Sequence, residues 1–302
     1  MINTLIHILL LVILPPLLLG IINKVKALFG GRRGPPVLQL YYDLAKLMRK
    51  GLVLSTTTTW IFVAAPVITL AAYLVGGLLV PQGAFSAPIV FTGDVILFAY
   101  LLGLARFFTT AAALDTGSAF EGMGAAREVT FACLAEPALF FALLVLAKLS
   151  GTLSLTGMLH WHEATGGLNA TAPLVLVAIG LAIVLLAETC RVPVDDPNTH
   201  LELTMIHEVM VLDHSGPLFG LILYGAAVKL FLLGTVLLHI IAPFETNHFW
   251  LDLALYVAEL IALAAAIGVV ESVMARLQMR HVPYLLIAAV LFCGFGFALL
   301  VR

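Results

Sequence analysis

The chain alternates long apolar stretches with short polar connections. An apolar run of about 17–25 residues can cross the hydrocarbon core of a bilayer as a helix, and eight such runs occur along the sequence. This pattern predicts an all-α, polytopic membrane protein with about eight transmembrane helices. The predicted spans are Thr4–Asn23, Thr58–Val80, Val95–Leu114, Phe131–Ser150, Pro173–Thr189, Pro217–Ala242, Leu251–Ala275 and Val282–Leu300.

The connection after the first span carries a helical pattern of its own. In GPPVLQLYYDLAKLMRKG, apolar residues recur at helical spacing beside Asp43, Lys46 and Arg49. This predicts an amphipathic helix over about residues 36–50 that lies in the membrane interface. The Pro-Pro pair fits its first turn, and Gly51 fits its end.

Basic residues are distributed unevenly among the connections. Lys and Arg occur on the first, third, fifth and seventh connections and are absent from the second, fourth and sixth. By the positive-inside rule the odd connections face the cytoplasm, and an even number of spans then places both termini outside. We expect one membrane domain over residues 1–302 in a prokaryotic cytoplasmic (inner) membrane. Acidic cytoplasmic loops are expected at about 115–130 and 188–216.

Composition agrees with the membrane assignment and excludes several classes. Of 302 residues, 62% are hydrophobic and 11% charged, whereas soluble domains are roughly one-quarter charged. A net charge of -2, with basic residues spread thinly, argues against a nucleic-acid partner. The three cysteines are far apart and form no CxxC pair, so no iron–sulfur or zinc site is expected from them. Any redox metal must belong to another chain.

Acidic residues concentrate at the predicted cytoplasmic helix ends. Like charges and partial burial favour the protonated form of some carboxyl groups, which can then pass protons through water. A solvated loop with incidental acids is the alternative. Glu136 argues for function, because it stands inside the apolar stretch ACLAEPALFFALL. The acids are Glu121, Glu128 and Glu136 around the third connection, and Glu188, Asp195, Asp196, Glu202, Glu208 and Asp213 around the fifth.

Lys229 and Glu259 stand near the middle of two consecutive spans. An unpaired charge at that depth costs a few kcal/mol or more, so both should face the bundle interior, where they can contact each other. A structural ion pair and a proton-relay role explain them equally well. Arg106 in the third span and Glu271 near the inner end of the seventh invite the same two interpretations.

Three histidines, His200, His207 and His214, recur every seven residues. This spacing exceeds that of chelating pairs on a helix, and no HExxH motif is present, so hydrogen bonding or proton carriage is favoured over a metal site. The sequence also contains no nucleophile with its base, phosphate loop or dinucleotide fingerprint. We therefore expect no catalytic centre in this chain alone.

Four segments, taken together, resemble a known family. GPPVLQLYYDLAKLMRKG, DTGSAFEGMGAAREVTFACLAEP, AETCRVPVDD…LEL…LDHSG and VESVMARLQMRHVPY resemble the membrane subunit that respiratory complex I shares with energy-converting nickel–iron hydrogenases. The resemblance implies an eight-helix bundle that joins a peripheral redox arm to an ion-pumping membrane arm. Glu188, Arg191 and Asp195 match its E-T-x-R-x-P-x-D motif, Glu136 matches a further family glutamate, and Asp213 replaces another.

Two departures favour the hydrogenase branch, which includes formate hydrogenlyase. The segment between Asp195 and Ser215 is longer than in the quinone-reducing pattern, and the sixth span carries Lys229 where an acid would be sought. The resemblance then implies a membrane anchor and coupling subunit. Coupling is expected from Glu136, Glu188, Asp195, Glu202, Glu208, Asp213, Lys229, Glu259 and Glu271, and docking or structural roles from Asp43, Lys46, Arg127 and Arg191.

The same resemblance implies partners and cofactors. The nickel–iron centre and iron–sulfur clusters would lie in hydrogenase-type large, small and iron–sulfur subunits on the cytoplasmic face, beside antiporter-like membrane subunits. No cofactor is expected on this chain. A quinone-reactive subunit of an NADH-quinone oxidoreductase-like complex is the alternative within the superfamily. A secondary transporter is disfavoured by the absence of repeated halves, and a purely structural anchor remains open.

Overall fold

The computed structural model describes residues 2–161, 171–195, 206–243, 246 and 248–301. Within these ranges eight helices are long and apolar enough to cross a membrane, which confirms the predicted all-α, polytopic fold. They are α1 (Ile2–Phe29), α3 (Trp60–Leu79), α4 (Asp94–Asp115), α5 (Ala119–Ser150), α8 (Thr171–Glu188), α9 (Gly216–Ile241), α10 (Phe249–Val273) and α11 (Val282–Val301).

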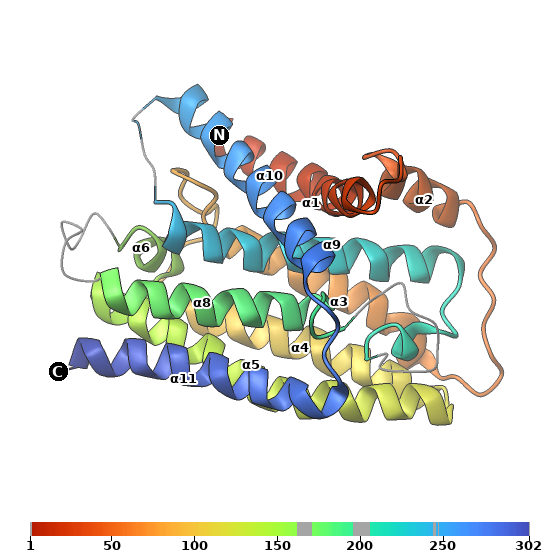
Figure 1. Ribbon diagram of the computed structural model, residues 1–302. Helices are drawn as coiled ribbons and strands as arrows, with labels where there is room; N and C mark the ends of the chain where they lie inside the picture. The colour runs from red at the N-terminus through yellow and green to blue at the C-terminus, as the bar shows by residue number, and fades with distance from the viewer. Residues whose placement is uncertain (1, 162–170, 196–205, 244–245, 247, 302) are drawn as a thin grey trace.

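The eight helices lie side by side in one bundle (Figure 1). The odd-numbered connections gather at one end, here named the odd-loop end, while both termini lie at the opposite, even-loop end. The amphipathic helix α2 (Gln39–Met48) contacts α1 and α9. The described residues also form three short elements: α6 (Leu155–Leu159) and the 3-10 turns η1 (Val209–Val211) and η2 (Met279–His281).

Helix α9 forms the centre of the bundle. Every residue from Ala227 to Ile240 is buried, and α9 contacts α1, α2, α3, α8 and α10. A helix that is apolar on all sides is stable only when other helices or lipid surround it. The single Lys229 in this stretch is therefore held inside protein and needs partners there.

Helix α5 begins earlier than the apolar pattern predicts. The expected acidic loop at about 115–130 is largely helical, because α5 starts at Ala119 and only a short turn separates it from α4. A search for apolar runs misses this polar beginning. At about 1.5 Å per residue, its 32 residues span roughly 48 Å, more than the ~30 Å hydrocarbon core. Glu121 and Glu128 thus stand on a helix.

Helix α2 is also shorter than predicted. It starts at Gln39 and ends at Met48, so the Pro-Pro pair and Gly51 lie outside it. The segment that precedes α2 instead lies against α1. A Cβ on Gly20 would lie 1.8 Å from the carbonyl oxygen of Val37, so only glycine allows this approach.

Helices α8 and α11 also meet at a glycine. A Cβ on Gly180 would lie 2.3 Å from Sγ of Cys293 and 3.0 Å from the carbonyl oxygen of Ala289. By contrast, Gly103 of α4 has open space at the same position. The two glycines therefore provide a matched pair for testing the packing.

We predict that Gly180→Ala lowers the midpoint of thermal unfolding in detergent by several degrees. Overpacking of a close contact costs about 1–3 kcal/mol. Gly103→Ala should leave the midpoint unchanged or raise it slightly, because alanine has the higher helix propensity. Fluorescence-monitored melting of both purified variants tests this, and equal midpoints would contradict the close α8–α11 packing.

Candidate functional site

Arg106 of α4 is the centre of a buried ion-pair network. Its terminal nitrogens contact Glu136 of α5 and Glu188 at the end of α8. The Nη2 atom lies 2.5 and 2.7 Å from the two Glu188 carboxylate oxygens. Its Nε atom lies 3.4 Å from Glu128. The planar guanidinium, with five donors in a fixed fork, can serve several carboxylates at once.

Lys229 of α9 joins the network from the other side. Its Nζ atom lies 2.6 Å from Oε2 of Glu188, so Glu188 is shared by two cations. The side chains of Arg106, Glu128, Glu188 and Lys229 are only 9–12% exposed. Desolvating such charges is costly unless each has close partners. The network thus satisfies the charged groups of four helices together.

The sequence placed Lys229 and Glu259 at similar depth, but the structure pairs Lys229 with Glu188 instead. Glu259 is half-buried on α10. Depth can be counted along the sequence, whereas the direction of each side chain around its helix depends on how the helices are rotated. No ion pair between the two is recorded among the described residues.

His207 connects this network to the connection after α8. Its Nε2 atom lies 3.1 Å from Oε2 of Glu128, and its Nδ1 atom lies 3.9 Å from Oδ2 of Asp195. Asp195 also accepts hydrogen bonds from the backbone N–H groups of Ile206 and His207, at 3.1 and 3.4 Å. These contacts hold the histidine between Asp195 of the loop and Glu128 of α5.

The surroundings of His207 determine its charge. Burial alone would lower the pKa of its imidazole, but the neighbouring Cys190, Glu128 and Asp195 side chains outweigh burial and hold the pKa well above its ordinary value. Burial raises the pKa of the Cys190 thiol. The raised pKa of the imidazole favours the protonated form of His207.

A second charged cluster surrounds Glu271 of α10. Its side chain is fully buried between Lys26 of α1, at 2.6 Å, and Arg191 after α8, at 3.1 Å. Two cations thus hold one carboxylate. This cluster ties α1 and α10 to the fifth connection and shares no recorded ion pair with Arg106 in the described part of the chain.

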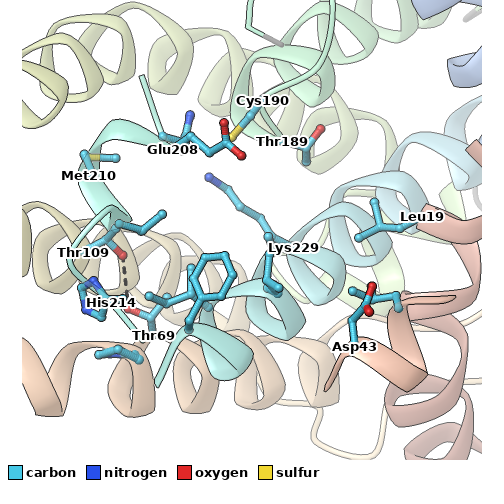
Figure 2. A pocket seen from close by; sticks show the side chains of 18 of the residues that line it. Leu19, Asp43, Thr69, Thr109, Thr189, Cys190, Glu208, Met210, His214 and Lys229 are labelled. Atoms are coloured by element: carbon cyan, nitrogen blue, oxygen red, sulfur yellow. Dashed lines mark hydrogen bonds between the residues drawn. The ribbon is translucent and has the colours of Figure 1, made fainter. Parts of the chain in front are cut away.

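A cavity of about 390 Å³ lies beside both clusters. It runs from the contact of α1 with α2 to the connection after α8, and Lys229 extends into it (Figure 2). Thr69 and Thr109, whose hydroxyl oxygens are 3.3 Å apart, line its wall. His214 lines it too and stacks on Phe62 at 3.9 Å between ring centres. Burial lowers the pKa of His214 to about 4.

The structure brings some predicted residues together and separates others. Glu136, Glu188 and Lys229 meet at Arg106, and Asp195 reaches them through His207. The others are distributed as follows: Glu271 lies in its own cluster, Glu208 and Asp43 line the cavity, Asp213 is exposed with its N–H donating to Glu121, Lys46 is exposed on α2, and Arg127 is half-buried near Met123 on α5. Asp196, His200 and Glu202 lie outside the described residues.

Arg106 and Glu128 have a larger part than the sequence assigned to them. The sequence pattern places Arg106 in the third span and Glu128 around the third connection, and neither belongs to the expected coupling set. The signal available was Arg106 itself, an arginine well inside an apolar span, which requires a nearby carboxylate. Which carboxylates it meets depends on the packing of α4 against α5.

The described residues do not fit a metal or cluster site. No group of three or more His, Cys, Asp or Glu side chains among them is arranged to hold a metal ion. Cys133, Cys190 and Cys293 are free thiols on three different segments.

Fold and site together define a multi-pass helical membrane protein with an ion-pair network inside its bundle. The chain belongs to the NADH dehydrogenase family, whose sequence pattern matches residues 2–301. This confirms the resemblance found in the four motifs.

Several relatives are similar over most of their length. Formate hydrogenlyase subunit 4 of Escherichia coli (strain K12) is 30% identical over 98% of this chain and 95% of the relative. Hydrogenase-4 component C of the same organism is 31% identical over 96% and 91%. A subunit of the NADH-quinone oxidoreductase of Anaplasma phagocytophilum (strain HZ) is 28% identical over 71% and 68%.

One solved structure shares the fold. A chain of the membrane-bound sulfane sulfur reductase, described as an archaeal respiratory membrane complex, superposes with a TM-score of 0.85. The two chains are 22% identical, and the match covers 99% of this chain and 98% of the other.

We predict that Arg106→Gln destabilises the chain more than Lys229→Gln. Arg106→Gln leaves three carboxylates short of a cation, whereas Lys229→Gln leaves Glu188 with Arg106. Breaking a buried pair costs about 3–5 kcal/mol. Yield of folded protein and thermal midpoint in detergent measure the difference, and a larger loss in Lys229→Gln would refute the central position of Arg106.

We further predict opposite pH effects at two histidines. His207 has a raised pKa, so its stabilisation is complete below pH ~6.5 and disappears as pH rises through the folded-state value. His207→Gln should therefore destabilise most at pH 6 and less at pH 9. His214 has a lowered pKa, so protonation costs stability as pH falls from ~6.5 to about 4.

The matched variant is His214→Phe, which keeps an aromatic ring against Phe62 and removes the titration. It should reduce the loss of stability between pH 6.5 and 4 by up to ~3 kcal/mol. Melting curves of the wild type and both variants across pH 4–9 provide the measurement. Parallel pH profiles for all three proteins would rule out the assigned protonation states.

Proposed function

We propose that this chain is the membrane anchor and coupling subunit of a multisubunit, membrane-bound hydrogenase-type complex similar to formate hydrogenlyase. It links redox chemistry in a cytoplasmic arm to translocation of protons or sodium ions. The observation that carries the proposal is the Arg106 network, which reaches from the odd-loop end to the interior of the bundle. A lipid anchor alone has no need for charges that are costly to bury.

Two findings support this assignment. Two relatives that match nearly the whole chain are named as a subunit of formate hydrogenlyase and a component of hydrogenase-4. The odd connections carry the Lys and Arg residues of the loops, so the odd-loop end faces the cytoplasm of the inner membrane by the positive-inside rule. Large, small and iron–sulfur subunits of the hydrogenase type dock on this face, beside antiporter-like membrane neighbours.

The geometry allows charge to be transmitted by competition for shared partners. Glu128 is shared by His207 and Arg106, and Glu188 is shared by Arg106 and Lys229. When His207 loses its proton, Glu128 interacts more strongly with Arg106, which weakens the hold of Arg106 on its other carboxylates. Unit charges 4 Å apart interact by about 4 kcal/mol at an effective dielectric constant of 20, enough to shift such a balance.

The chain's residues bind and move protons, and the redox chemistry is placed elsewhere. A nickel–iron centre and iron–sulfur clusters in partner subunits would supply hydrogen evolution and electron transfer. Among the described members of the network, Asp195 and His207 belong to the connection after α8. This connection is part of the odd-loop end, which is the proposed docking face. A change in charge beside them is transmitted inward through Glu128.

A quinone-reactive subunit is the second candidate, and the cavity beneath α2 favours it. Its volume of about 390 Å³ lies within the range of small-molecule pockets. The hydrogenase-type function is preferred because the matches to hydrogenase subunits cover more of the chain than the matches to quinone-reducing subunits. Quinone recovered with the purified complex, or inhibition by quinone-site inhibitors, would favour the second candidate.

We predict that Glu188→Gln and Glu136→Gln reduce ion pumping several-fold more than hydrogen evolution with an artificial electron donor. Both variants remove a negative charge from the Arg106 network and leave the partner's catalytic centre untouched. Ion uptake and hydrogen production are measured together in inverted membrane vesicles, with assembly verified by copurification of the subunits.

Glu259 belongs to the coupling set expected from the sequence, but it lies on α10 outside the Arg106 ion pairs. Glu259→Gln is therefore the matched comparison: if coupling runs through the Arg106 network, its ratio of ions pumped to hydrogen evolved should equal that of the wild type. Normal pumping in both network variants, with intact assembly, would refute the coupling function.

A further inference from the structure

Glu136 differs from the other members of its network. Its side chain is 45% exposed, whereas those of Arg106, Glu128 and Glu188 are between 9% and 12% exposed. Arg106 contacts the carboxylate from inside the bundle. The remainder of the carboxylate therefore faces outward, away from the chain.

This outward carboxylate lies within the hydrocarbon depth of the membrane. Glu136 is 14 residues from Ser150, the last residue of α5. At about 1.5 Å per residue the separation is ~21 Å along the helix axis, well within a ~30 Å hydrocarbon core that begins near the even-loop end. The surface of α5 around it therefore faces lipid chains rather than bulk water.

The residues around Glu136 form an exposed stripe on α5, here named the α5 outer stripe. Its other members are Val129, Cys133, Phe140 and Leu144, and successive members are three or four residues apart, which places them on one helix face. Val129, Phe140 and Leu144 are 47–50% exposed, and Cys133 is exposed as well. Lipid chains can cover the apolar members, but they offer no hydrogen-bond donor to the carboxylate oxygen of Glu136 that does not contact Arg106.

We propose that the α5 outer stripe is the binding surface for a transmembrane helix of a neighbouring subunit. This helix presents a hydrogen-bond donor or a cation to Glu136. The inference deepens the proposed function, on which it rests, by locating the contact with a membrane partner. The chemistry of the partner's group follows from the site. The outward carboxylate oxygen of Glu136 accepts hydrogen bonds, and an ionised acid on the partner helix would be repelled by it.

The arrangement makes Glu136 the outermost member of the network. Arg106 connects it inward to Glu188 and Glu128, while the partner's donor meets it from outside. A shift in the hold of Arg106 on Glu136 therefore changes the charge that the neighbouring subunit experiences. The contact thus provides a route from this chain to a membrane neighbour.

Native Cys133 allows a direct test, because it lies on the stripe one turn from Glu136. In the whole complex, with Cys190→Ser and Cys293→Ser, Cys133 is labelled in the membrane with a thiol-reactive photocrosslinker. We expect capture of a membrane-embedded subunit, identified by mass spectrometry of the adduct. In the control, Cys133 is replaced by serine and the label is attached at Phe295→Cys on α11. Phe295 is 63% exposed. This control should capture at least several-fold less of that subunit.

A second set of variants tests the role of the carboxylate. Glu136→Leu should reduce capture from Cys133 several-fold, because it removes the acceptor, whereas Glu136→Gln keeps an acceptor oxygen and should retain capture. Phe140→Leu, an apolar change on the same stripe, should retain it also. Adducts with phospholipid only, or capture unchanged in Glu136→Leu, would overturn the inference.

These outcomes are separate from those that test the proposed function. If Cys133 captures only lipid while Glu188→Gln still uncouples pumping from hydrogen evolution, the coupling function is supported and the α5 binding surface is refuted. If Cys133 captures a membrane subunit while both network variants pump normally, the α5 binding surface is supported and the coupling function is refuted.

Discussion

The low dielectric of the bundle interior is the constraint on which the rest of this structure depends. Arg106 and Lys229 lie among Glu128, Glu136 and Glu188, and His207 joins them between Glu128 and Asp195. This mutual pairing lets the ionic groups occupy a region where a lone charge would be very costly. It also means that one proton gained or lost changes the energy of every member, because the low-dielectric surroundings screen the change only weakly.

The network determines what the surrounding helices must do. α4, α5, α8 and α9 each contribute charged groups, so their rotation about their own axes is fixed by the need to bring those groups together. The apolar surfaces around them are more tolerant, because many side chains pack acceptably against one another. Close approaches such as Gly20 with Val37 and Gly180 with Cys293 then set the separation of individual pairs of elements.

The sequence predicts the spans well and the pairings poorly, for a physical reason. Lipid requires long apolar helices, so α1 or α9 can be recognised from composition alone. The polar first turns of α5 project beyond the apolar core and carry no such signal. Family motifs located Glu188 and Asp195, but the contact of Lys229 with Glu188 depends on helix rotation, which a sequence pattern does not specify.

The cluster of Lys26, Glu271 and Arg191 has a mechanical meaning for the odd-loop end. It fastens the end of α1, the end of α10 and the connection after α8 at a single buried point. A pull on any one of these segments is therefore resisted by the other two. Movement at the end of α1, at the end of α10 or at Arg191 is therefore coupled to the other two through one carboxylate.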